Sequence, residues 1–256
     1  MISAAISRCS ARWGLTWKRG NETAEKRSDA SKGLFITGTG TDVGKTYIAG
    51  LLLKKLSDSG LACAYYKAAM SGNRRDRGGA LIPGDAVCVR NVSRIAQPLE
   101  EMCPYVYETA VSPHLASKLE GGPIDMKKVR EGYLRLAARC EYIVAEGSGG
   151  IVCPLRYDQK KLFLEDVIKA LGLPTLLVAD AGLGTINGTV LTVEYMASRG
   201  IPVKGIILNR FHEGNVMEED NKIMCEALTG VPVVACVEDN CTDIGLGGEF
   251  IASLCE

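Results

Sequence analysis

Gly38-Thr39-Gly40-Thr41-Asp42-Val43-Gly44-Lys45-Thr46 is the stretch of this 256-residue chain that decides its fold. It follows a short apolar run at residues 33–37 and opens an amphipathic run at residues 47–56. A strand, a glycine-rich turn, Gly-Lys-Thr and a helix in this order form a cradle for phosphate. Backbone N–H groups and the helix N-terminus face the anion, the lysine reaches the β- and γ-phosphates, and the hydroxyl holds Mg²⁺. The stretch therefore predicts a nucleotide-phosphate site.

This loop is a variant of the usual phosphate-binding pattern. The usual pattern has about four residues between its first glycine and Gly-Lys-Thr, whereas Gly38 leaves five. The three letters Gly-Lys-Thr alone are also compatible with a surface turn. The strand before them and the helix after them favour the phosphate site.

Length, composition and charge narrow the class of protein. The 256 residues suit one α/β domain, or at most two small ones, and 46% hydrophobic residues are enough for a sizeable core. The formal net charge is zero, which argues against a nucleic-acid surface. No apolar run reaches the roughly 18–20 residues that a membrane-spanning helix needs. We therefore expect small-molecule partners and neither a nucleic-acid nor a membrane partner.

The ten cysteines and two histidines are scattered along the chain. Several cysteines lie in apolar runs, and a phosphate-binding α/β enzyme normally works in a reducing compartment, so we expect free thiols that pack like small hydrophobic side chains. No cysteine pair has Cys-x-x-Cys spacing, and His114 and His212 do not form a metal cluster in the sequence.

Residues 1–32 differ from the rest of the chain. They hold 7 Lys/Arg and 3 Asp/Glu, and the first 21 residues contain no acid. This composition resembles a transit peptide, but Glu22, Glu25 and Asp29 end the acid-free stretch, and we favour a disordered extension. We predict a single ATP-binding domain over residues 33–256 and a cytoplasmic location, with organellar targeting as the less favoured alternative.

From residue 33 onward, apolar runs alternate with helical patterns. The predicted strands cover residues 33–37, 62–67, 142–146, 175–179, 205–209 and 232–237. The predicted helices cover residues 45–57, 85–93, 113–120, 126–139, 162–171, 186–199 and 217–228. Several strands are continuously apolar, as expected of strands buried on both faces. The pattern predicts an α/β fold of the phosphate-loop NTPase type, with a mostly parallel central sheet flanked by helices.

Polar residues stand where predicted strands end, which is where parallel sheets bind ligands. Lys67 closes the second strand, Glu146 closes the third, and Asp85 begins a helix. Beside a phosphate loop, a second cation is what phosphoryl transfer requires, and carboxylates suit Mg²⁺. Each residue also has a simpler interpretation, because Lys67 can reach solvent, Glu146 can cap a helix or be solvated, and Asp85 can be an N-cap.

Two further segments follow strands in the same way. Residues 182–187 open a helix, so they are a second potential anion site. Asn209 ends a strand, where it can be a turn residue or can read a nucleotide base through its amide.

Together these residues resemble the dethiobiotin synthetase family, whose members are ATP-dependent enzymes that close the ureido ring in biotin synthesis. The matching pieces are residues 38–46, Tyr66-Lys67, Ser71-Gly72, Asp85-Ala86, Ser112-Pro113-His114, Glu146-Gly147-Ser148-Gly149-Gly150, residues 182–187 and Asn209. Each piece is weak alone, but the pieces come in the family's order and spread over most of residues 33–240.

The resemblance implies a homodimer with active sites at the subunit interface, and 7,8-diaminononanoate, CO₂ (or bicarbonate) and MgATP as substrates. It implies catalytic roles for Lys45 at the β/γ-phosphates, Thr41 at the transferring group and Lys67 at the carbamate. It implies ATP or Mg²⁺ contacts from Asp42, Val43, Gly44, Lys45, Thr46, Tyr47, Asp85, Glu146, Gly147, Ser148, Gly149 and Asn209, with Thr46, Asp85 and Glu146 at the metal. It implies substrate contacts from Ser71 and from the partner subunit's Gly184, Thr185 and Asn187.

The sequence departs from the family pattern at three positions and leaves two other classes to consider. The family often has Asp where Gly40 stands, Pro where Ala68 stands and His where Gly188 stands. Amidotransferase synthetases of the cobyrinate type carry a glutaminase domain, for which the 47 residues after Asn209 leave no room. Partition-type switch ATPases carry a lysine early in the loop, where this chain has Gly38, Thr39 and Gly40.

Overall fold

The computed structural model describes residues 32–256, so the predicted extension lies outside the described residues except for Lys32. Within this range no helix combines the length and apolar character needed to cross a membrane. The described cysteines, from Cys63 to Cys255, are all free thiols, as the sequence predicts.

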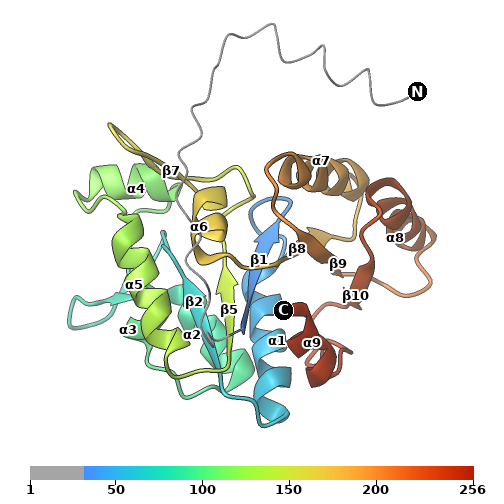
Figure 1. Cartoon of the computed structure of the whole chain (residues 1–256), viewed down its shortest axis with the longest axis horizontal. Helices are drawn as coiled ribbons and strands as arrows, with labels where there is room; N and C mark the ends of the chain where they lie inside the picture. The colour runs from blue at the N-terminus through green and yellow to red at the C-terminus, as the bar shows by residue number, and fades with distance from the viewer. Residues whose placement is uncertain (1–31) are drawn as a thin grey trace, which may run out of the picture.

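Six parallel strands form the central sheet, in the order β10-β9-β8-β1-β5-β2 (Figure 1). Their bounds are β1 Lys32–Gly38, β2 Cys63–Lys67, β5 Tyr142–Glu146, β8 Thr175–Asp180, β9 Val203–Asn209 and β10 Val233–Val237. The strands β2 and β5, which come next in the chain, lie on one side of β1, and the later strands β8, β9 and β10 lie on the other. In open parallel sheets a ligand binds where the strand order reverses in this way. The sheet therefore places a binding site at the carboxyl end of β1.

The remaining elements are helices and two short antiparallel hairpins, β3–β4 and β6–β7. The hairpin strands are β3 Arg74–Arg75, β4 Leu81–Ile82, β6 Pro154–Tyr157 and β7 Lys161–Phe163. The helices are α1 Lys45–Asp58, α2 Gly84–Ser93, α3 Leu99–Met102, α4 Pro113–Leu119, α5 Met126–Ala137, α6 Leu164–Leu171, α7 Thr185–Ser198, α8 Val216–Thr229 and α9 Gly248–Leu254.

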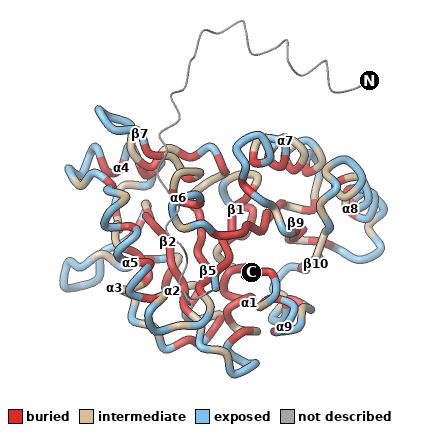
Figure 2. The backbone as a smooth tube through the Cα atoms, in the orientation of Figure 1, coloured by how far each residue is buried: buried red, intermediate tan, exposed pale blue. Residues whose placement is uncertain are grey.

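Helices cover both faces of the sheet, which makes it the buried middle layer (Figure 2). Side chains alternate between the two faces along a strand. Leu34 and Ile36 of β1 therefore pack in the cluster that contains α1, α2 and α9. Phe35 packs on the opposite face, in the cluster that contains α5 and α6, and α7 and α8 cover the same face beside β8 and β9. This explains why the central strands are apolar without interruption.

The structure confirms the predicted fold class and the six predicted strands, with small shifts at their ends. The helix predicted at residues 162–171 was wrong at its start. Leu162 and Phe163 belong to β7, and the helix begins at Leu164. Both hairpins, α3 and α9 are absent from the prediction, because such short elements show too few repeats of an apolar pattern to be recognised.

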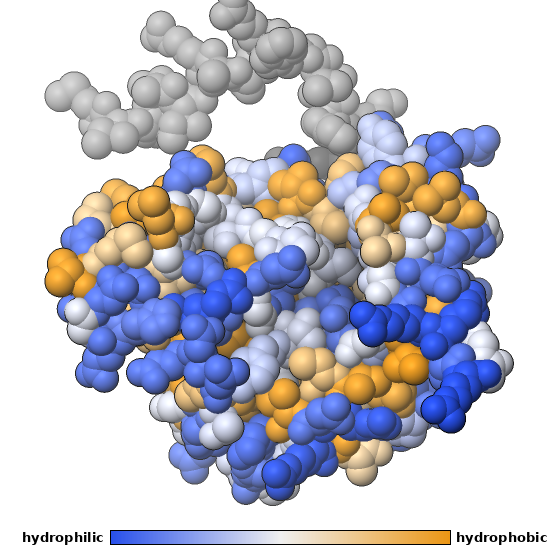
Figure 3. Space-filling model, turned by 180° about the vertical axis from the view of Figure 1, so that it is seen from behind, coloured by the Kyte–Doolittle hydropathy of each residue, from blue (hydrophilic) through white to orange (hydrophobic). Residues whose placement is uncertain are grey.

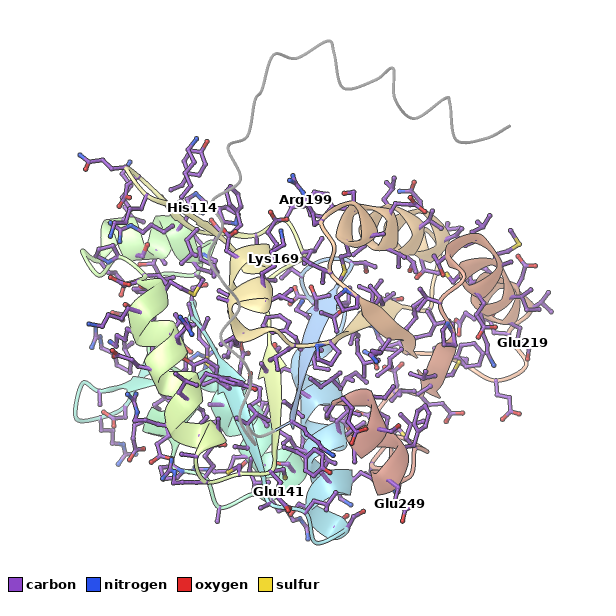
Figure 4. The ribbon with its side chains drawn as sticks, in the orientation of Figure 1. His114, Glu141, Lys169, Arg199, Glu219 and Glu249 are labelled. Carbon is purple, nitrogen blue, oxygen red and sulfur yellow. The ribbon has the colours of Figure 1, made fainter. Side chains whose placement is uncertain are left out.

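An acidic side chain links the helices α6 and α7 on the outer surface. Glu165 accepts a hydrogen bond from the Tyr195 hydroxyl at 2.7 Å, and it lies 3.9 Å from Lys169 and 3.6 Å from Arg199. Figure 4 shows Lys169 and Arg199 on the same side of the molecule. This contact joins the last turn of α7 to α6, at the end of α7 opposite to the segment predicted to meet a substrate.

Candidate active site

The phosphate loop (residues 38–46) leaves β1 and enters α1 through two residues in the left-handed backbone region. Asp42 has φ 61° and Gly44 has φ 96°. A Cβ atom on Gly44 would lie 2.1 Å from the Asn209 amide nitrogen, so both backbone angle and space require glycine there. The helix α1 begins at Lys45, and its N-terminal N–H groups are available to an anion, as at other helix N-termini.

The last residue of β9 and the residue that follows it hold the phosphate loop. The Asn209 amide donates to the Val43 carbonyl at 3.1 Å, and Arg210 donates to the Asp42 carbonyl at 2.9 Å. Asp180 accepts from the Arg210 Nε at 2.6 Å and so fixes the guanidinium. The C=O and N–H groups of one trans peptide unit point in opposite directions. Because the carbonyls of Asp42 and Val43 point towards the end of β9, the N–H groups of Val43 and Gly44 point away from it.

The ends of β2 and β5 bring an ammonium group and a carboxylate into contact. Lys67 and Glu146 are register partners on these neighbouring strands. Lys67 Nζ lies 2.5 Å from Glu146 Oε1 and 2.7 Å from Asp85 Oδ2. The Thr46 hydroxyl donates to the same Glu146 oxygen at 2.8 Å. The structure therefore joins the phosphate loop, Lys67, Asp85 and Glu146 into one polar network.

This network opens into a cavity of about 450 Å³ at the carboxyl ends of β1, β2 and β5. The cavity is lined by Thr41, Asp42, Gly44, Lys45, Thr46, Tyr47, Lys67, Met70, Ser71, Asp85, Cys88, Glu146, Ser148 and Gly149. Apart from Met70 and Cys88, every lining residue belongs to the predicted site. The simpler interpretations of Lys67 and Asp85 were wrong. Lys67 is 5% exposed, and the N-cap of α2 is Pro83, with Asp85 in the first turn.

Some predicted site residues do not line this cavity. Val43 is 8% exposed and packs in the core. Asn209 is 5% exposed and is bonded to the loop backbone, so its role at the base stays a prediction. Gly147 packs tightly, because a Cβ there would lie 2.6 Å from Leu164.

The residues predicted to act from a partner subunit lie at the start of α7. Gly184 has φ 92° and is the N-cap of this helix. Gly184 and Asn187 are exposed, whereas the side chain of Thr185 is buried. His114, part of another matching piece, lies at the start of α4 with its Nδ1 3.0 Å from the Ser112 hydroxyl (Figure 4). It is not among the residues that line the cavity.

Two buried lysines face this cavity in different electrostatic environments. Burial lowers the pKa of Lys67, but the carboxylates of Glu146 and Asp85 outweigh burial, and the pKa is raised. Burial and the charge of Lys67 lower the pKa of Lys45, against the opposing effect of the nearby carboxylates. Lys45 Nζ donates to the Gly40 carbonyl at 2.6 Å. Lys67 is thus a fixed cation, and Lys45 is a cation with little compensating charge until an anion binds.

Comparison with known proteins identifies the family. A family model described as an AAA domain matches residues 32–242. An ATP-dependent dethiobiotin synthetase BioD from Brachyspira hyodysenteriae is 48% identical over 210 residues, which cover 82% of this chain and 93% of that protein. A protein of the same name from Clostridium novyi is 48% identical over 212 residues, which cover 81% and 87%. This chain belongs to the dethiobiotin synthetase family.

A solved structure of a ParA family ATPase from Chlorobium tepidum TLS covers 83% of this chain and 86% of its own, with TM-score 0.49 and 13% identity. A likeness at this level says nothing of function. Membership in the dethiobiotin synthetase family confirms the predicted family and decides against the cobyrinate-type and partition-type alternatives.

The departures from the dethiobiotin synthetase pattern do not close the cavity. A Cβ on Gly40 would have no atom within 4 Å, and a Cβ on Gly188 would lie 3.5 Å from the Thr39 Cβ, an ordinary contact. Gly188 thus lies beside the phosphate loop. Both glycines leave space where the family often has a larger side chain. Ala68 is 5% exposed and packs in the core.

Three residues of the site region are absent from the prediction. Cys88 lies one helical turn after Asp85, a spacing that places both on one face of α2. Met70 closely follows Lys67 and lines the same cavity. Tyr65 precedes Lys67 by two residues, so both side chains lie on one face of β2. The spacing from Asp85 or Lys67, both of which are predicted site residues, could have indicated each of the three.

The oxygen-bearing side chains around Lys67 are of the kind that binds Mg²⁺. Mg²⁺ prefers hard oxygen ligands and is usually held by one or two carboxylates together with substrate phosphates and water. Thr46, Asp85 and Glu146 supply a hydroxyl and two carboxylates beside the phosphate loop. Within residues 32–256 no group of three or more His, Cys, Asp or Glu side chains could hold a metal alone. The donor set therefore fits Mg²⁺ that arrives with a nucleotide.

Lys45→Met is expected to raise the stability of the nucleotide-free protein at neutral pH. Folding lowers the pKa of Lys45, so the unfolded chain holds this proton more tightly than the folded protein does. Between the folded pKa and the ordinary value of 10.5, the stability of the unaltered protein rises with pH. The advantage of Lys45→Met should therefore shrink as pH rises from 7 to 10, as measured by urea unfolding.

The matched control for this prediction is Lys127→Met, because the Lys127 side chain is 84% exposed. It should show no such pH-dependent advantage. A Lys45→Met variant that is less stable than the unaltered protein at every pH would contradict the account of Lys45 as an uncompensated buried cation.

Proposed function

We propose that this protein closes the ureido ring of dethiobiotin from 7,8-diaminononanoate, CO₂ and ATP. One amine takes up CO₂ as a carbamate and releases a proton. A carbamate oxygen attacks the γ-phosphorus, the bond to the β-phosphate oxygen breaks, and ADP leaves. The second amine then attacks the carbonyl of the resulting carbamic-phosphoric anhydride and loses a proton, and phosphate leaves as the ring closes.

The observation that carries this proposal is the position of Lys67. It lies in the same cavity as the phosphate loop, is 5% exposed, and is held by Glu146 and Asp85. A carbamate is an anion that readily loses CO₂, so its activation beside ATP requires fixed positive charge and little bulk water. Lys67 would stabilise the carbamate and the charge that develops during transfer. Lys45 and the first turn of α1 would bind the β- and γ-phosphates.

Two serines in the cavity are suited to hold the amino groups of the substrate. Ser71 donates its hydroxyl proton to the Val111 carbonyl at 2.6 Å, and Ser148 donates to the Ala69 carbonyl at 2.8 Å. A hydroxyl whose proton is engaged presents its lone pairs to other donors. We propose that Ser71 and Ser148 accept hydrogen bonds from the diamine.

Thr46, Asp85 and Glu146 would hold Mg²⁺, which supplies charge neutralisation to the triphosphate when it is bound. Thr46 and Glu146 are already in contact, so the two sides of this site need little rearrangement. Thr41 lines the cavity and would contact the transferring group.

We further propose that the working unit is a homodimer in which the start of α7 completes the partner's site. Leu183, just before α7, is 93% exposed, Leu191 on α7 is 61% exposed, and Asn187 in the first turn of α7 is also exposed. Figure 3 shows apolar side chains on the side of the molecule that carries α7 and α8. Sedimentation at micromolar concentration should give a dimer, and Asn187→Ala should raise the KM for the diamine. A monomer with full activity would contradict this arrangement.

The proposed reaction predicts that ATP hydrolysis depends on both other substrates. ADP release should be slow with MgATP alone and should rise at least about tenfold when diaminononanoate and bicarbonate are added together. Either addition alone should have little effect, because the phosphoryl acceptor is their joint product. A rate of ADP release that does not change when both compounds are added would contradict the proposal.

A further inference from the structure

We propose that Tyr65 is a positioning residue for Glu146: its phenol holds one carboxylate oxygen so that the other faces Thr46 and Lys67. The inference rests on the proposed function insofar as Glu146 serves the nucleotide's metal. Tyr65 is not part of the predicted site, and it contacts Glu146 without itself lining the cavity.

The two oxygens of Glu146 have different partners. Oε2 accepts from the Tyr65 hydroxyl at 2.7 Å. Oε1 accepts from the Thr46 hydroxyl at 2.8 Å and from Lys67 Nζ at 2.5 Å. Rotating the carboxylate out of its plane would break all three bonds at once. The phenol therefore fixes the plane of the carboxylate, which keeps one oxygen directed at Thr46 and Lys67.

The strand geometry explains why Tyr65 reaches this carboxylate. Tyr65 and Lys67 lie two positions apart on β2 and so project from the same face of the sheet. Tyr65 is the register partner of Val144, two residues before Glu146 on β5. A long phenol side chain directed along the strand spans this offset. Tyr66, on the opposite face, donates instead to the Val129 carbonyl at 2.6 Å.

Tyr65 is itself held in place at the edge of the sheet. The strand β2 is an edge strand, which leaves some of its backbone groups without a strand partner. The Gln97 side chain fills this role for Tyr65, since it accepts from the Tyr65 N–H at 2.8 Å and donates to the Tyr65 carbonyl at 3.0 Å. The residue is therefore fixed through both its backbone and its ring.

Burial makes this contact an effective constraint. Tyr65 is 0% exposed and Glu146 is 2% exposed, so water does not readily replace either partner. Loss of the hydroxyl would leave a buried carboxylate oxygen without its donor, and the carboxylate would be free to turn away from the cavity.

The test is the effect of Tyr65→Phe on ADP binding with and without Mg²⁺, measured by titration calorimetry. Residues that orient a metal ligand typically contribute about 10–100-fold to metal affinity. Tyr65→Phe should weaken ADP binding by about tenfold in excess Mg²⁺ and by less than about twofold in EDTA. Tyr66→Phe, which removes a buried hydroxyl on the opposite face, should leave both affinities unchanged.

A merely structural role for Tyr65 would lower both affinities together, and that result, or no change in either, would overturn the proposal. If Tyr65→Phe does not fold, Gln97→Met at the half-buried sheet edge replaces it. Gln97→Met should reduce the factor by which Mg²⁺ strengthens ADP binding by about threefold. If this factor does not change, the proposal is overturned. The diamine takes no part in these titrations, so their outcome is separate from any failure to form dethiobiotin.

Discussion

Lys67→Met is expected to lower kcat for ring closure by about 10²–10³-fold, the usual effect of removing one charge that stabilises a transition state. Lys67 is the cation that Glu146 and Asp85 hold beside the phosphate loop. Methionine keeps much of the side-chain volume and removes the charge. Steady-state kinetics with all three substrates would measure the loss.

ADP binding separates this loss from misfolding. The phosphate loop and α1 do not include Lys67, so Lys67→Met should still bind ADP within about tenfold of the unaltered protein. Lys127→Met, at an exposed position on α5, should keep normal turnover. Normal turnover of Lys67→Met itself would remove Lys67 from the mechanism.

Glu146→Ala is expected to destabilise the protein by about 3–5 kcal/mol, the range for breaking a buried ion pair by removing one partner. The Glu146 side chain is 0% exposed and the Lys67 side chain is 6% exposed. The substitution would leave Lys67 with Asp85 alone and would remove the acceptor for the hydroxyls of Tyr65 and Thr46. Urea unfolding monitored by circular dichroism would measure the change.

The matched control is Glu131→Ala, whose side chain is 53% exposed and lies 4.0 Å from Lys127 on the helix surface. Its effect should stay below about 0.5 kcal/mol, as is usual for exposed positions. If Glu146→Ala cost no more than Glu131→Ala, the buried network would not be a stabilising part of the fold.

The sequence predicted the parts of the molecule that local physics determines. The phosphate loop is readable because its glycines and the Gly-Lys-Thr triplet have a fixed order between a strand and a helix. The six strands are readable because burial on both faces requires apolar runs. Lys67 and Glu146 could be brought together in advance, because parallel strands place their carboxyl ends at one edge of the sheet.

Other features depend on contacts between distant segments. The hydrogen bond from Asn209 to Val43 joins residues 166 positions apart, and no local sequence pattern indicates it. The pairing of Gln97 with the backbone of Tyr65 requires knowing that β2 lies at the edge of the sheet. The last residues of the β6–β7 hairpin, Leu162 and Phe163, show the same limit, because strand pairing overrides the short apolar pattern that predicts a helix there.

The most direct test of the central claim is the incubation of the purified protein with diaminononanoate, MgATP and ¹³C-labelled bicarbonate, followed by mass spectrometry. We expect dethiobiotin that carries the label in its ureido carbon, formed in equal amount to ADP and phosphate. A protein that binds ATP but forms no labelled dethiobiotin at saturating substrates would contradict the account.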